Sequence, residues 1–393
     1  MINFLRRTWA EINLDHVAHN IKEIRRITSK DSLIMAVTKA DAYGHGFLEV
    51  SKTLLANGAD RLAVALLDEA RQLRVNGITA PIMILGHTPE QWSHEIIEMD
   101  IIQTVFNYPS AQAISQAALA KKKIADIHIK LDTGMTRIGF DCSQDSLDMI
   151  LNISKLPGIN IEGIFTHFAS ADEKEDQYTR LQYKRFASMC NKLEECGVHI
   201  PVKHVCNSAG IIQFPEMHLD MVRPGIILYG LYPSEEIDKE KVLLKPVMEL
   251  KSVITHMKEI ESGIPVSYGR IFKTSQRTKI ATVPVGYADG FSRILSETAM
   301  MIVGDSIVPV IGRICMDQCM IDVTDVKNIS IDDEVVIFGR KNGMEISIEE
   351  IAKKLGTISY EVVCMVGKRV PRVYIKNGEI VNILNYLGVR SEE

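Results

Sequence analysis

The chain has 393 residues, with 45 lysines and arginines against 50 aspartates and glutamates, and its formal net charge is −5. This length suits two domains, each with its own core, and a mild charge without a basic stripe argues against nucleic-acid binding. There is no apolar run long enough for a membrane span and no signal-peptide pattern at the N-terminus. Seven scattered cysteines without a C-x-x-C pair favour reduced thiols over disulfides or a zinc site. We therefore expect a cytoplasmic protein of enzyme size, without a metal.

The first part of the chain has the pattern of alternating strands and helices. In a leading segment, 8–14, polar and apolar residues alternate as in a strand, and this segment could pack with either domain. After it, amphipathic stretches such as 177–196 separate short apolar runs. The predicted strands are 33–37, 62–65, 82–85, 102–106, 127–131, 163–167, 203–206 and 221–228. This pattern predicts a (β/α)8 TIM-like barrel, with a doubly wound sheet as the alternative. We favour the barrel because polar residues follow five of these strands, and a barrel gathers such positions at one end.

The pattern of alternating strands and helices ends at a charged stretch, 235–241, which we interpret as a linker. Alternating apolar runs follow, and they predict a mostly β second domain. These runs are 247–254, 279–284, 300–303, 308–311, 320–323, 334–338 and 370–374. Ser347 is a plausible N-cap for one helix, 348–355. The predicted domains are 1–240 and 241–393.

The segment A-V-T-K-A-D-A-Y-G-H-G at 36–46 places Lys39 just after the first barrel strand. A lysine at the end of a buried strand is costly unless it is paired or used covalently. Desolvation lowers the pKa of such an amine, and the free amine can form a Schiff base with an aldehyde cofactor. For this lysine taken alone, a side chain that extends to the surface is the simpler alternative.

Strand five carries His128, Lys130 and Asp132 at alternate positions, so their side chains share one face. A packed barrel interior tolerates a bare lysine poorly. We expect Lys130 to be compensated by an ion pair with Asp132 or a neighbour, or by a covalent change of its charge. His167, at the end of strand six, could stack on a cofactor, relay hydrogen bonds to Arg223, or be an ordinary core histidine.

The seventh barrel strand runs into N-S-A-G at 207–210, and the eighth, 221–228, carries R-P-G-I at 223–226. Backbone amides and a hydroxyl at these positions of a barrel commonly hold phosphate, although two ordinary turns are the alternative. Arg223 lies in an apolar run, so it either pairs with Asp220 or a neighbouring strand, or donates to a ring nitrogen. An arginine in the second role keeps a pyridine nitrogen unprotonated and limits the spread of negative charge into the ring.

These segments together resemble alanine racemase, a fold-type III family that uses pyridoxal 5'-phosphate (PLP). The resemblance covers nearly the whole chain and agrees in order across both domains. Besides the segment at 36–46, the matching motifs are K-L-D-T-G-M-T-R-I-G at 130–139, T-H-F-A at 166–169, N-S-A at 207–209, M-V-R-P-G-I-I-L-Y-G at 221–230, V-S-Y-G at 266–269, G-Y-A-D-G at 286–290 and R-I-C-M-D-Q at 313–318.

The resemblance implies interconversion of L- and D-alanine, which supplies D-alanine for peptidoglycan. Lys39 would be the Schiff-base lysine and the base for the D-enantiomer. Tyr268 would be the base for the L-enantiomer, supplied across the interface of a homodimer. Two bases are required because racemisation removes a proton on one face of the carbon and returns it on the other.

The resemblance also implies the remaining contacts. The phosphate ligands would be Tyr43, Ser208, Gly225, Ile226 and Tyr360. Arg223 would contact the pyridine nitrogen, with His167 beside it, and Arg137 and the backbone at Met316 would bind the substrate carboxylate. Lys130 matches a lysine that is carbamylated in many relatives, which would turn its cation into an anion able to pair with Arg137.

Three other functions remain as alternatives. An amino-acid decarboxylase on the same fold would place a glutamate, rather than Arg223, at the ring nitrogen. A PLP-binding protein without catalysis would resemble the barrel alone, without the domain that carries Tyr268. A barrel without a cofactor would leave Lys39, Lys130 and Arg223 as three unexplained charges.

Overall fold

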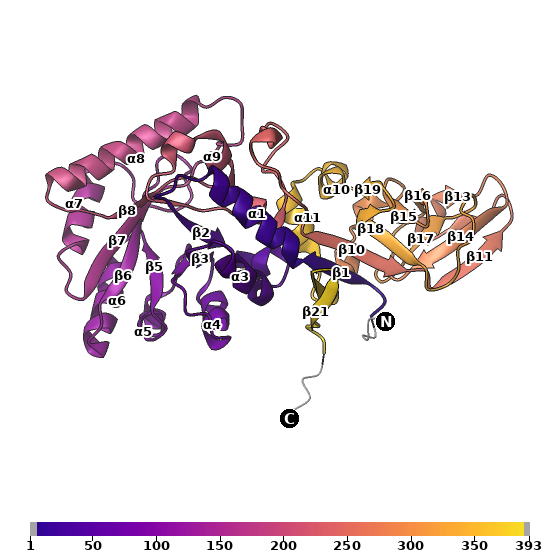
Figure 1. Ribbon diagram of the computed structural model, residues 1–393, viewed down its shortest axis with the longest axis horizontal. Coiled ribbons are helices and arrows are strands. Elements are labelled where there is room, and N and C mark those ends of the chain that lie inside the picture. The colour runs from indigo at the N-terminus through magenta and orange to yellow at the C-terminus, as the bar shows by residue number, and fades with distance from the viewer. Residues whose placement is uncertain (1–5, 389–393) are drawn as a thin grey trace. The chain divides into compact units, whose positions relative to one another are not determined.

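The computed structural model describes residues 6–388, and the chain divides into two compact units (Figure 1). Unit 1 takes its described residues from Met1–Asp15, Tyr43–Gly46 and Pro246–Glu393. Unit 2 comprises His16–Ala42 and Phe47–Lys245. The short segment Tyr43–Gly46, which follows Lys39 closely in the sequence, thus belongs to unit 1.

Unit 2 is a barrel of parallel strands, in the order β8-β7-β6-β5-β4-β3-β2-β9. Its strands are β2 (Leu33–Val37), β3 (Arg61–Val64), β4 (Ile82–Ile84), β5 (Ile101–Val105), β6 (Ala125–Lys130), β7 (Ile159–Phe165), β8 (Val202–His204) and β9 (Met221–Val222). Backbone hydrogen bonds from Asp220 N to Lys203 O (3.1 Å) and from Arg223 N to Cys206 O (3.0 Å) join the two ends of this sheet. The predicted barrel is therefore confirmed, and the doubly wound alternative is excluded.

Helices of unit 2 follow the strands and cover the outside of the barrel, as the indigo to pink ribbons of Figure 1 show. They are α1 (Leu14–Ile27), α3 (Phe47–Ala56), α4 (Leu67–Val75), α5 (Ser93–Glu98), α6 (Tyr108–Lys121), α7 (Gln144–Ile153), α8 (Gln177–Glu195) and α9 (Ser208–Gln213). A further short element, α2 (Lys39–Tyr43), is not a right-handed helix and is described with the site. Strands such as β4 are buried along their whole length, as expected for parallel strands with a packed interior and a helical cover.

One predicted strand is longer than the strand observed. The apolar run 221–228 forms only the two residues of β9, and Ile226–Tyr229 form a 3-10 turn. Pro224 has no backbone N–H to donate to a sheet, and Gly225 adopts φ −120° and ψ −97°, outside strand geometry. Arg223 consequently lies just after a strand and not within one.

Unit 1 is built on a mostly antiparallel sheet with the order β11-β14-β17-β16-β15-β18-β10-β1-β20-β21, and β19 pairs with β18. These strands are β1 (Trp9–Asn13), β10 (Met248–Val253), β11 (His256–Ile260), β14 (Thr278–Val283), β15 (Met300–Val303), β16 (Ser306–Ile311), β17 (Cys319–Asp322), β18 (Glu334–Lys341), β19 (Met344–Ile346), β20 (Arg372–Lys376) and β21 (Glu379–Leu384). A separate pair is formed by β12 (Pro265–Val266) and β13 (Phe272–Lys273). The leading strand β1 pairs with β10 and β20, so it belongs to this sheet.

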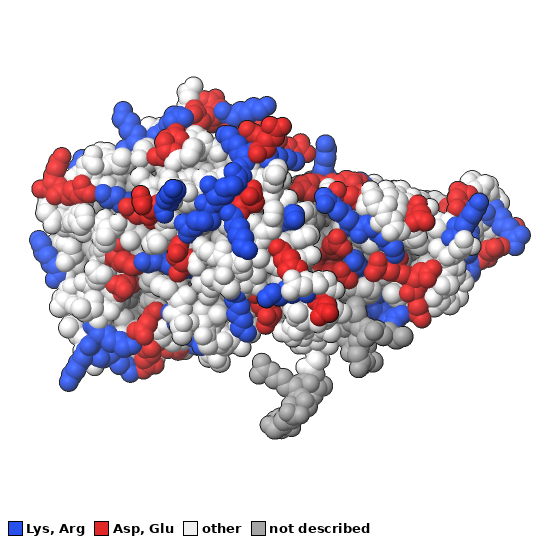
Figure 2. Space-filling view, viewed as in Figure 1, with Lys and Arg blue, Asp and Glu red and all other residues white. Residues whose placement is uncertain are grey.

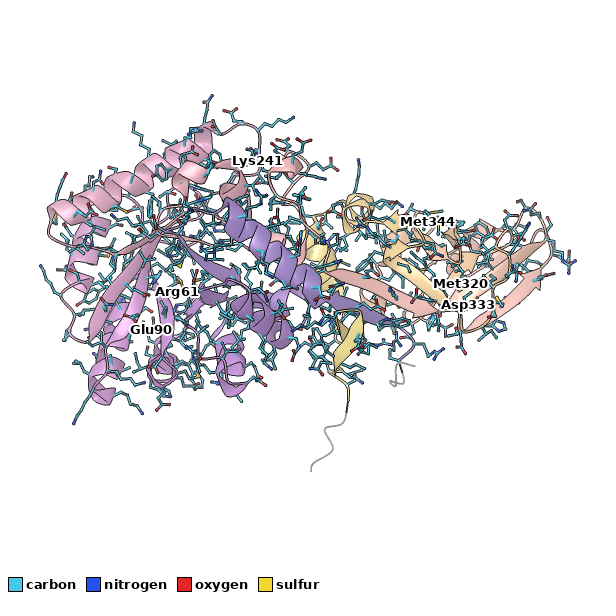
Figure 3. All side chains as sticks on the ribbon, viewed as in Figure 1. Arg61, Glu90, Lys241, Met320, Asp333 and Met344 are labelled. Carbon is cyan, nitrogen blue, oxygen red and sulfur yellow. The ribbon has the colours of Figure 1, made fainter. Side chains whose placement is uncertain are left out.

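Unit 1 also contains the helices α10 (Ile348–Leu355) and α11 (Ser359–Met365). The Ser347 hydroxyl accepts the Glu350 N–H at 3.0 Å, which confirms the predicted N-cap of α10. Gly356 ends this helix with a φ of +69°. Side chains from β12, β14 and β16 pack together in one small core of the unit: Val266, Ile280 and Ile311. Figure 3 labels Met320 and Asp333 in this unit.

Candidate active site

A left-handed turn follows Lys39. Ala40, Asp41, Ala42 and Tyr43 have φ between +52° and +56°, and none of them is glycine. This conformation costs roughly 1–2 kcal/mol per residue for an L-amino acid, so surrounding contacts must hold it. The Asp41 carboxylate accepts the N–H of Phe47 at 2.9 Å, and Ala42 N donates to the Thr38 carbonyl at 2.9 Å. Lys39 thus follows the buried strand β2 on a backbone that its surroundings impose.

Arg223 is buried at the same end of the barrel and is held by four acceptors within unit 2. Its guanidinium donates to His204 Nδ1 (2.8 Å), His167 Nδ1 (3.5 Å) and the carbonyls of Thr166 (2.7 Å) and Val205 (3.0 Å). Burial lowers the pKa of Arg223 to about 10. The alternative of an ion pair with Asp220 is not realised among the described residues. Arg223 Nε forms no hydrogen bond with a described residue, so this N–H remains available to a ligand.

A chain of hydrogen bonds runs from Arg223 through the barrel. His204 Nε2 lies 2.8 Å from His128 Nδ1, and His128 Nε2 lies 2.9 Å from the carboxylate of Glu162. Because Arg223 can only donate, His204 Nδ1 is an acceptor. His204 then donates from Nε2 to His128 Nδ1, and His128 donates from Nε2 to Glu162. Both imidazoles are therefore neutral, and burial lowers the pKa of each.

Glu162 ends this chain of hydrogen bonds. Its carboxylate also pairs with Arg61 at 2.8 Å; Figure 3 labels Arg61 on the barrel. Burial alone would raise the pKa of Glu162, but the hydrogen bonds from His128 and Arg61 outweigh burial and lower it to about 2. From the sequence, His128 was expected only as a polar strand residue, and the roles of His204, Glu162 and Arg61 were not predicted. Polar residues at inward positions of neighbouring strands were the only signal available.

Lys130 is 4 % exposed and points into the barrel. Its Nζ donates to the Leu131 carbonyl at 2.6 Å and lies 5.5 Å from the centre of the Phe165 ring. No ion pair among the described residues includes Lys130, so the expected pairing with Asp132 is not formed. The carboxylate of Asp132 instead accepts the N–H groups of Gly134 (2.9 Å) and Thr136 (3.0 Å). Burial and the charge of Arg223 lower the pKa of Lys130 to about 7.

Positive charge is concentrated at this end of unit 2. His167 lies close enough to Lys39, Lys130, Arg137 and Arg223 for all four charges, after burial, to lower its pKa well below the usual range. His167 is consequently neutral at physiological pH. A concentration of basic side chains around a neutral imidazole suits a ligand that carries negative charge.

The loops after β8 and β9 meet through Ser208. The backbone N–H of Gly225 donates to the Ser208 hydroxyl at 2.9 Å, and Ser208 is buried at the first turn of α9. Asn207 caps this turn by accepting the N–H of Gly210 at 2.9 Å. Ile226, fully buried, begins the next turn. The first loop follows its strand as predicted, whereas residues 224–226, predicted within a strand, form a turn after β9. A hydroxyl and turn amides are groups that can bind phosphate.

Two tyrosines of unit 1 form a second group of donors. The rings of Tyr43 and Tyr360 have centroids 6.1 Å apart, and burial raises the pKa of Tyr43. Its hydroxyl therefore stays protonated and can donate. Arg372 Nε donates to the Gly44 carbonyl at 2.9 Å, and a Cβ on Gly44, whose φ is +78°, would lie 2.5 Å from Val363 O. The glycine after Tyr43 is thus required by a close approach of backbone to α11.

Tyr268 lies on a strained loop of unit 1, and its side chain is 67 % exposed. Ser267 before it has a φ of +64°, and the Ser267 hydroxyl donates to Arg313 O at 2.6 Å. A Cβ on Gly312 would lie 2.8 Å from Val266 O, so the loop packs tightly on its neighbour. The loop presents the phenol to solvent on a constrained backbone.

Met316 lies on the adjoining loop of unit 1 and is 52 % exposed. Its carbonyl accepts the N–H of Ala288 at 3.0 Å, while its own N–H forms no hydrogen bond with a described residue. Buried Asp289 anchors the facing loop by accepting Gly286 N at 3.0 Å and pairing with Arg6 at 2.6 Å. A backbone donor at Met316 therefore remains open to a ligand, whereas the anchoring by Asp289 was not predicted from the sequence.

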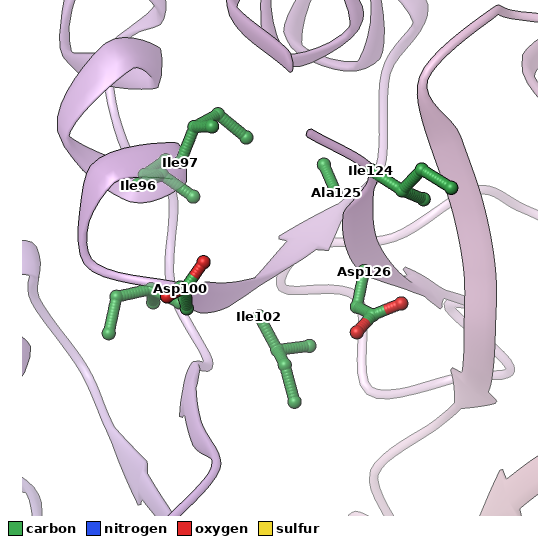
Figure 4. Close-up of a pocket in the computed structure, with 8 residues that line it drawn as sticks. Ile96, Ile97, Asp100, Ile102, Ile124, Ala125 and Asp126 are labelled. Carbon is green, nitrogen blue, oxygen red and sulfur yellow. The ribbon is translucent and has the colours of Figure 1, made fainter. Parts of the chain in front are cut away.

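A pocket elsewhere on unit 2 is too small for a cofactor. A pocket of about 70 Å³ lies at the opposite, N-terminal ends of β5 and β6 (Figure 4), and it is smaller than pockets that bind cofactors. It is lined by Ile96, Ile97, Asp100, Ile101, Ile102, Ile124, Ala125 and Asp126. Figure 2 shows both signs of charge interspersed over the visible face. Within residues 6–388 no cluster of three or more His, Cys, Asp or Glu residues is placed to hold a metal, and no helix has the length and apolar character of a membrane span.

Comparison with known proteins identifies the family. Sequence models of the alanine racemase N-terminal and C-terminal domains match residues 12–233 and 247–374. The alanine racemase of Clostridium tetani is 53 % identical over 388 residues, which cover 98 % of this chain and 100 % of that protein. The alanine racemase of Methanococcus maripaludis is 52 % identical over 367 residues, covering 93 % of this chain and 98 % of its own.

Solved structures agree with these matches. Alanine racemase from Clostridium difficile 630 superposes with a TM-score of 0.94 at 46 % identity, covering 99 % of this chain and 100 % of its own. The Bacillus anthracis enzyme with bound L-Ala-P gives a TM-score of 0.92 at 38 % identity, covering 98 % of this chain and 99 % of its own. The chain is an enzyme of the alanine racemase family.

Proposed function

We propose that this enzyme interconverts L- and D-alanine with PLP as cofactor, using Lys39 and Tyr268 as its two bases. The observation that supports this proposal best is the set of hydrogen bonds made by the Arg223 guanidinium. A buried arginine, fixed by neutral His204 and three other acceptors, retains its Nε as a free donor. Such a donor suits an unprotonated pyridine nitrogen, whereas a decarboxylase of this fold is expected to have a carboxylate at this position.

The donor groups of both units fit PLP. In unit 2, the Ser208 hydroxyl and the turn amides at Gly225 and Ile226 suit a phosphate. In unit 1, the protonated Tyr43 and its neighbour Tyr360 supply further hydroxyls. When bound, PLP withdraws electrons from the Cα of the amino acid and acidifies its hydrogen.

The two bases have separate tasks. Lys39 would hold the cofactor aldehyde and move the proton of D-alanine, and Tyr268 would move the proton of L-alanine from the opposite face. The left-handed turn after Lys39 fixes the backbone from which this amine reaches the cofactor. Arg137 and the open N–H of Met316 bind the substrate carboxylate. The D-alanine produced would supply peptidoglycan synthesis.

The exposed position of Tyr268 supports a homodimer in which each site is completed by a second copy. Tyr268, Ile271 and Met316 are all exposed side chains of unit 1. An exposed catalytic tyrosine cannot exclude water unless another surface covers it. In the proposed dimer, Tyr268 and Met316 of one copy serve the Lys39 site of the other.

Lys130 is proposed to be carbamylated. A pKa of about 7 leaves much of the amine uncharged at neutral pH, and an uncharged amine can attack dissolved CO₂. An N–C bond forms, a proton passes to solvent, and the product is an anionic carbamate. This anion would remove the unpaired buried cation and could pair with Arg137.

Incubation of the PLP-loaded protein with L-alanine in D₂O tests the proposed activity. Optical rotation should fall to zero while deuterium enters at Cα, because each inversion takes its proton from a base that exchanges with solvent. Cα deuteration with release of CO₂ would indicate a decarboxylase instead. Retention of both rotation and Cα hydrogen, despite bound cofactor, would contradict the proposal.

A further inference from the structure

We propose that Glu69 is a positioning residue that holds the backbone after Lys39; this inference rests on the proposed function of Lys39. Glu69 lies in the first turn of α4, after the neighbouring strand β3. One carboxylate oxygen, Oε1, accepts the N–H of Ala40 at 2.6 Å. The other, Oε2, accepts the N–H groups of Ala65 (2.8 Å) and Leu66 (3.2 Å). A single side chain therefore ties the turn after β2 to the loop after β3.

The turn after Lys39 needs such a tie because its conformation is unfavourable. Ala40 is the first of four consecutive non-glycine residues with positive φ. Ala40 is also exposed, so core packing does not fix it, and the Asp41 carboxylate is already used by Phe47 N. Glu69 is the side chain whose hydrogen bond holds the residue next to Lys39. Release of this bond would let the turn relax and carry the lysine amine away from its working position.

Helix capping alone does not explain all the hydrogen bonds of the Glu69 carboxylate. Capping of α4 uses only Oε2, whereas the bond to Ala40 uses Oε1. All three partners are donors, and a carboxylate can accept at both oxygens, so the negative charge is matched by three N–H groups. No ion pair of the described residues includes Glu69. A glutamine has one acceptor oxygen, so it could cap α4 or hold Ala40, but not both.

Three variants separate positioning from helix stability. Glu69→Gln retains one acceptor, Glu69→Ala retains none, and Asn107→Ala is the control. Asn107 caps α6 of the same barrel by accepting the Ser110 N–H at 2.8 Å, and α6 is a separate helix that follows β5. Each protein is studied as the PLP-loaded holoenzyme. The measurements are kcat and KM for L-alanine, the thermal midpoint, and amide hydrogen exchange of a peptide spanning 38–46.

We expect faster amide hydrogen exchange at 38–46 in Glu69→Ala, because alanine leaves the Ala40 N–H without its acceptor. Its kcat should fall by about tenfold with KM changed less than about twofold, because the amine is misplaced while substrate contacts remain. In Glu69→Gln the single remaining oxygen serves either Ala40 or the cap of α4, so faster exchange at 38–46 should accompany a wild-type thermal midpoint, and wild-type exchange should accompany a lowered midpoint. Asn107→Ala should lower the midpoint and leave exchange at 38–46 unchanged.

Two results would overturn the proposal: unchanged exchange at 38–46 in Glu69→Ala, or the same exchange and kcat changes in Asn107→Ala. A wild-type protein that fails to racemise alanine would instead refute the proposed function. The exchange comparison would still decide whether Glu69 holds the turn. The two failures are therefore distinguishable.

Discussion

At the scale of single residues, the site depends on groups whose charge the barrel suppresses. Lys130 has a pKa of about 7 because burial and the charge of Arg223 disfavour its protonated form. His167 and His204 are kept neutral by the same two causes. Neutral imidazoles allow Arg223 to keep its full charge beside them, since a protonated histidine would repel the guanidinium. The sequence predicted that Lys130 required compensation, and it could not select among the alternatives.

Labelled bicarbonate tests whether Lys130 forms a carbamate. At fixed ¹³C-bicarbonate, the protein should show a carbamate resonance that grows as the pH rises through about 7, because the uncharged fraction of Lys130 grows with it. Lys130→Ala should abolish the resonance. The control is Lys203→Ala, which alters a partly exposed lysine paired with Glu194 and should leave the resonance unchanged. Absence at pH 8 of any resonance that depends on Lys130 would contradict the assignment.

At the scale of elements, the barrel strands bring together residues that the sequence keeps far apart. Glu162 on β7, His128 on β6, His204 on β8 and Arg223 after β9 form one chain of hydrogen bonds. The negative end of this chain balances Arg61 and orients both imidazoles. Each strand contributes a single polar group, so the chain exists only when the strands are in register.

Replacement of Glu162 tests the energetic weight of this chain. The folded pKa of about 2 lies below the usual value of 4.5, so Glu162 stabilises the fold above pH 4.5, and this contribution is lost as the pH falls toward 2. Glu162→Gln should lower the free energy of unfolding by roughly 2–3 kcal/mol at pH 7. In urea titrations, the difference from wild type should be smaller at pH 3.

The matched control is Glu194→Gln, which removes an exposed partner of Lys203 from the same barrel. Its effect should stay below about 1 kcal/mol, as for most surface ion pairs. Equal losses of unfolding free energy in the two variants at pH 7 would show that the hydrogen bonds of Glu162 stabilise the fold no more than a surface ion pair does. A Glu162→Gln deficit that grows as the pH falls would contradict the sign of its pKa shift.

The same scale separates what the sequence could predict from what it could not. Periodic apolar runs predicted all eight strands of the barrel and the helix α10 with its Ser347 cap, because burial of one face imposes the pattern. The strands β11 and β21 were missed: both are mostly exposed, and the apolar residues of β21 do not alternate with polar ones. The left-handed turn was also missed, because alanine and tyrosine have no preference for positive φ. The contacts of Glu69 depend on two neighbouring loops, which no local pattern reveals.

At the scale of the whole molecule, the proposed bases belong to different compact units. Lys39, Arg137, Ser208 and Arg223 lie in unit 2, whereas Tyr43 and Tyr268 lie in unit 1. Each unit has its own sheet and orders its residues by its own contacts. The barrel supplies charge and the candidate cofactor contacts Ser208 and Arg223, and the β-rich unit supplies Tyr43, Tyr360 and the exposed phenol of Tyr268. The proposed reaction requires residues of both units. Because Lys39 and Tyr268 lie in different units, the task of each base can be tested separately.

The central claim is that Lys39 and Tyr268 each serve one enantiomer, and Tyr268→Phe tests it most directly. Holoenzyme carrying this change is incubated in D₂O with L-alanine and, separately, with D-alanine, and Cα deuteration is followed by NMR. Exchange of D-alanine should continue through Lys39, while exchange of L-alanine should fall by at least about a hundredfold, the contribution of a general base. Equal exchange of both enantiomers, whether retained or lost, would contradict the account.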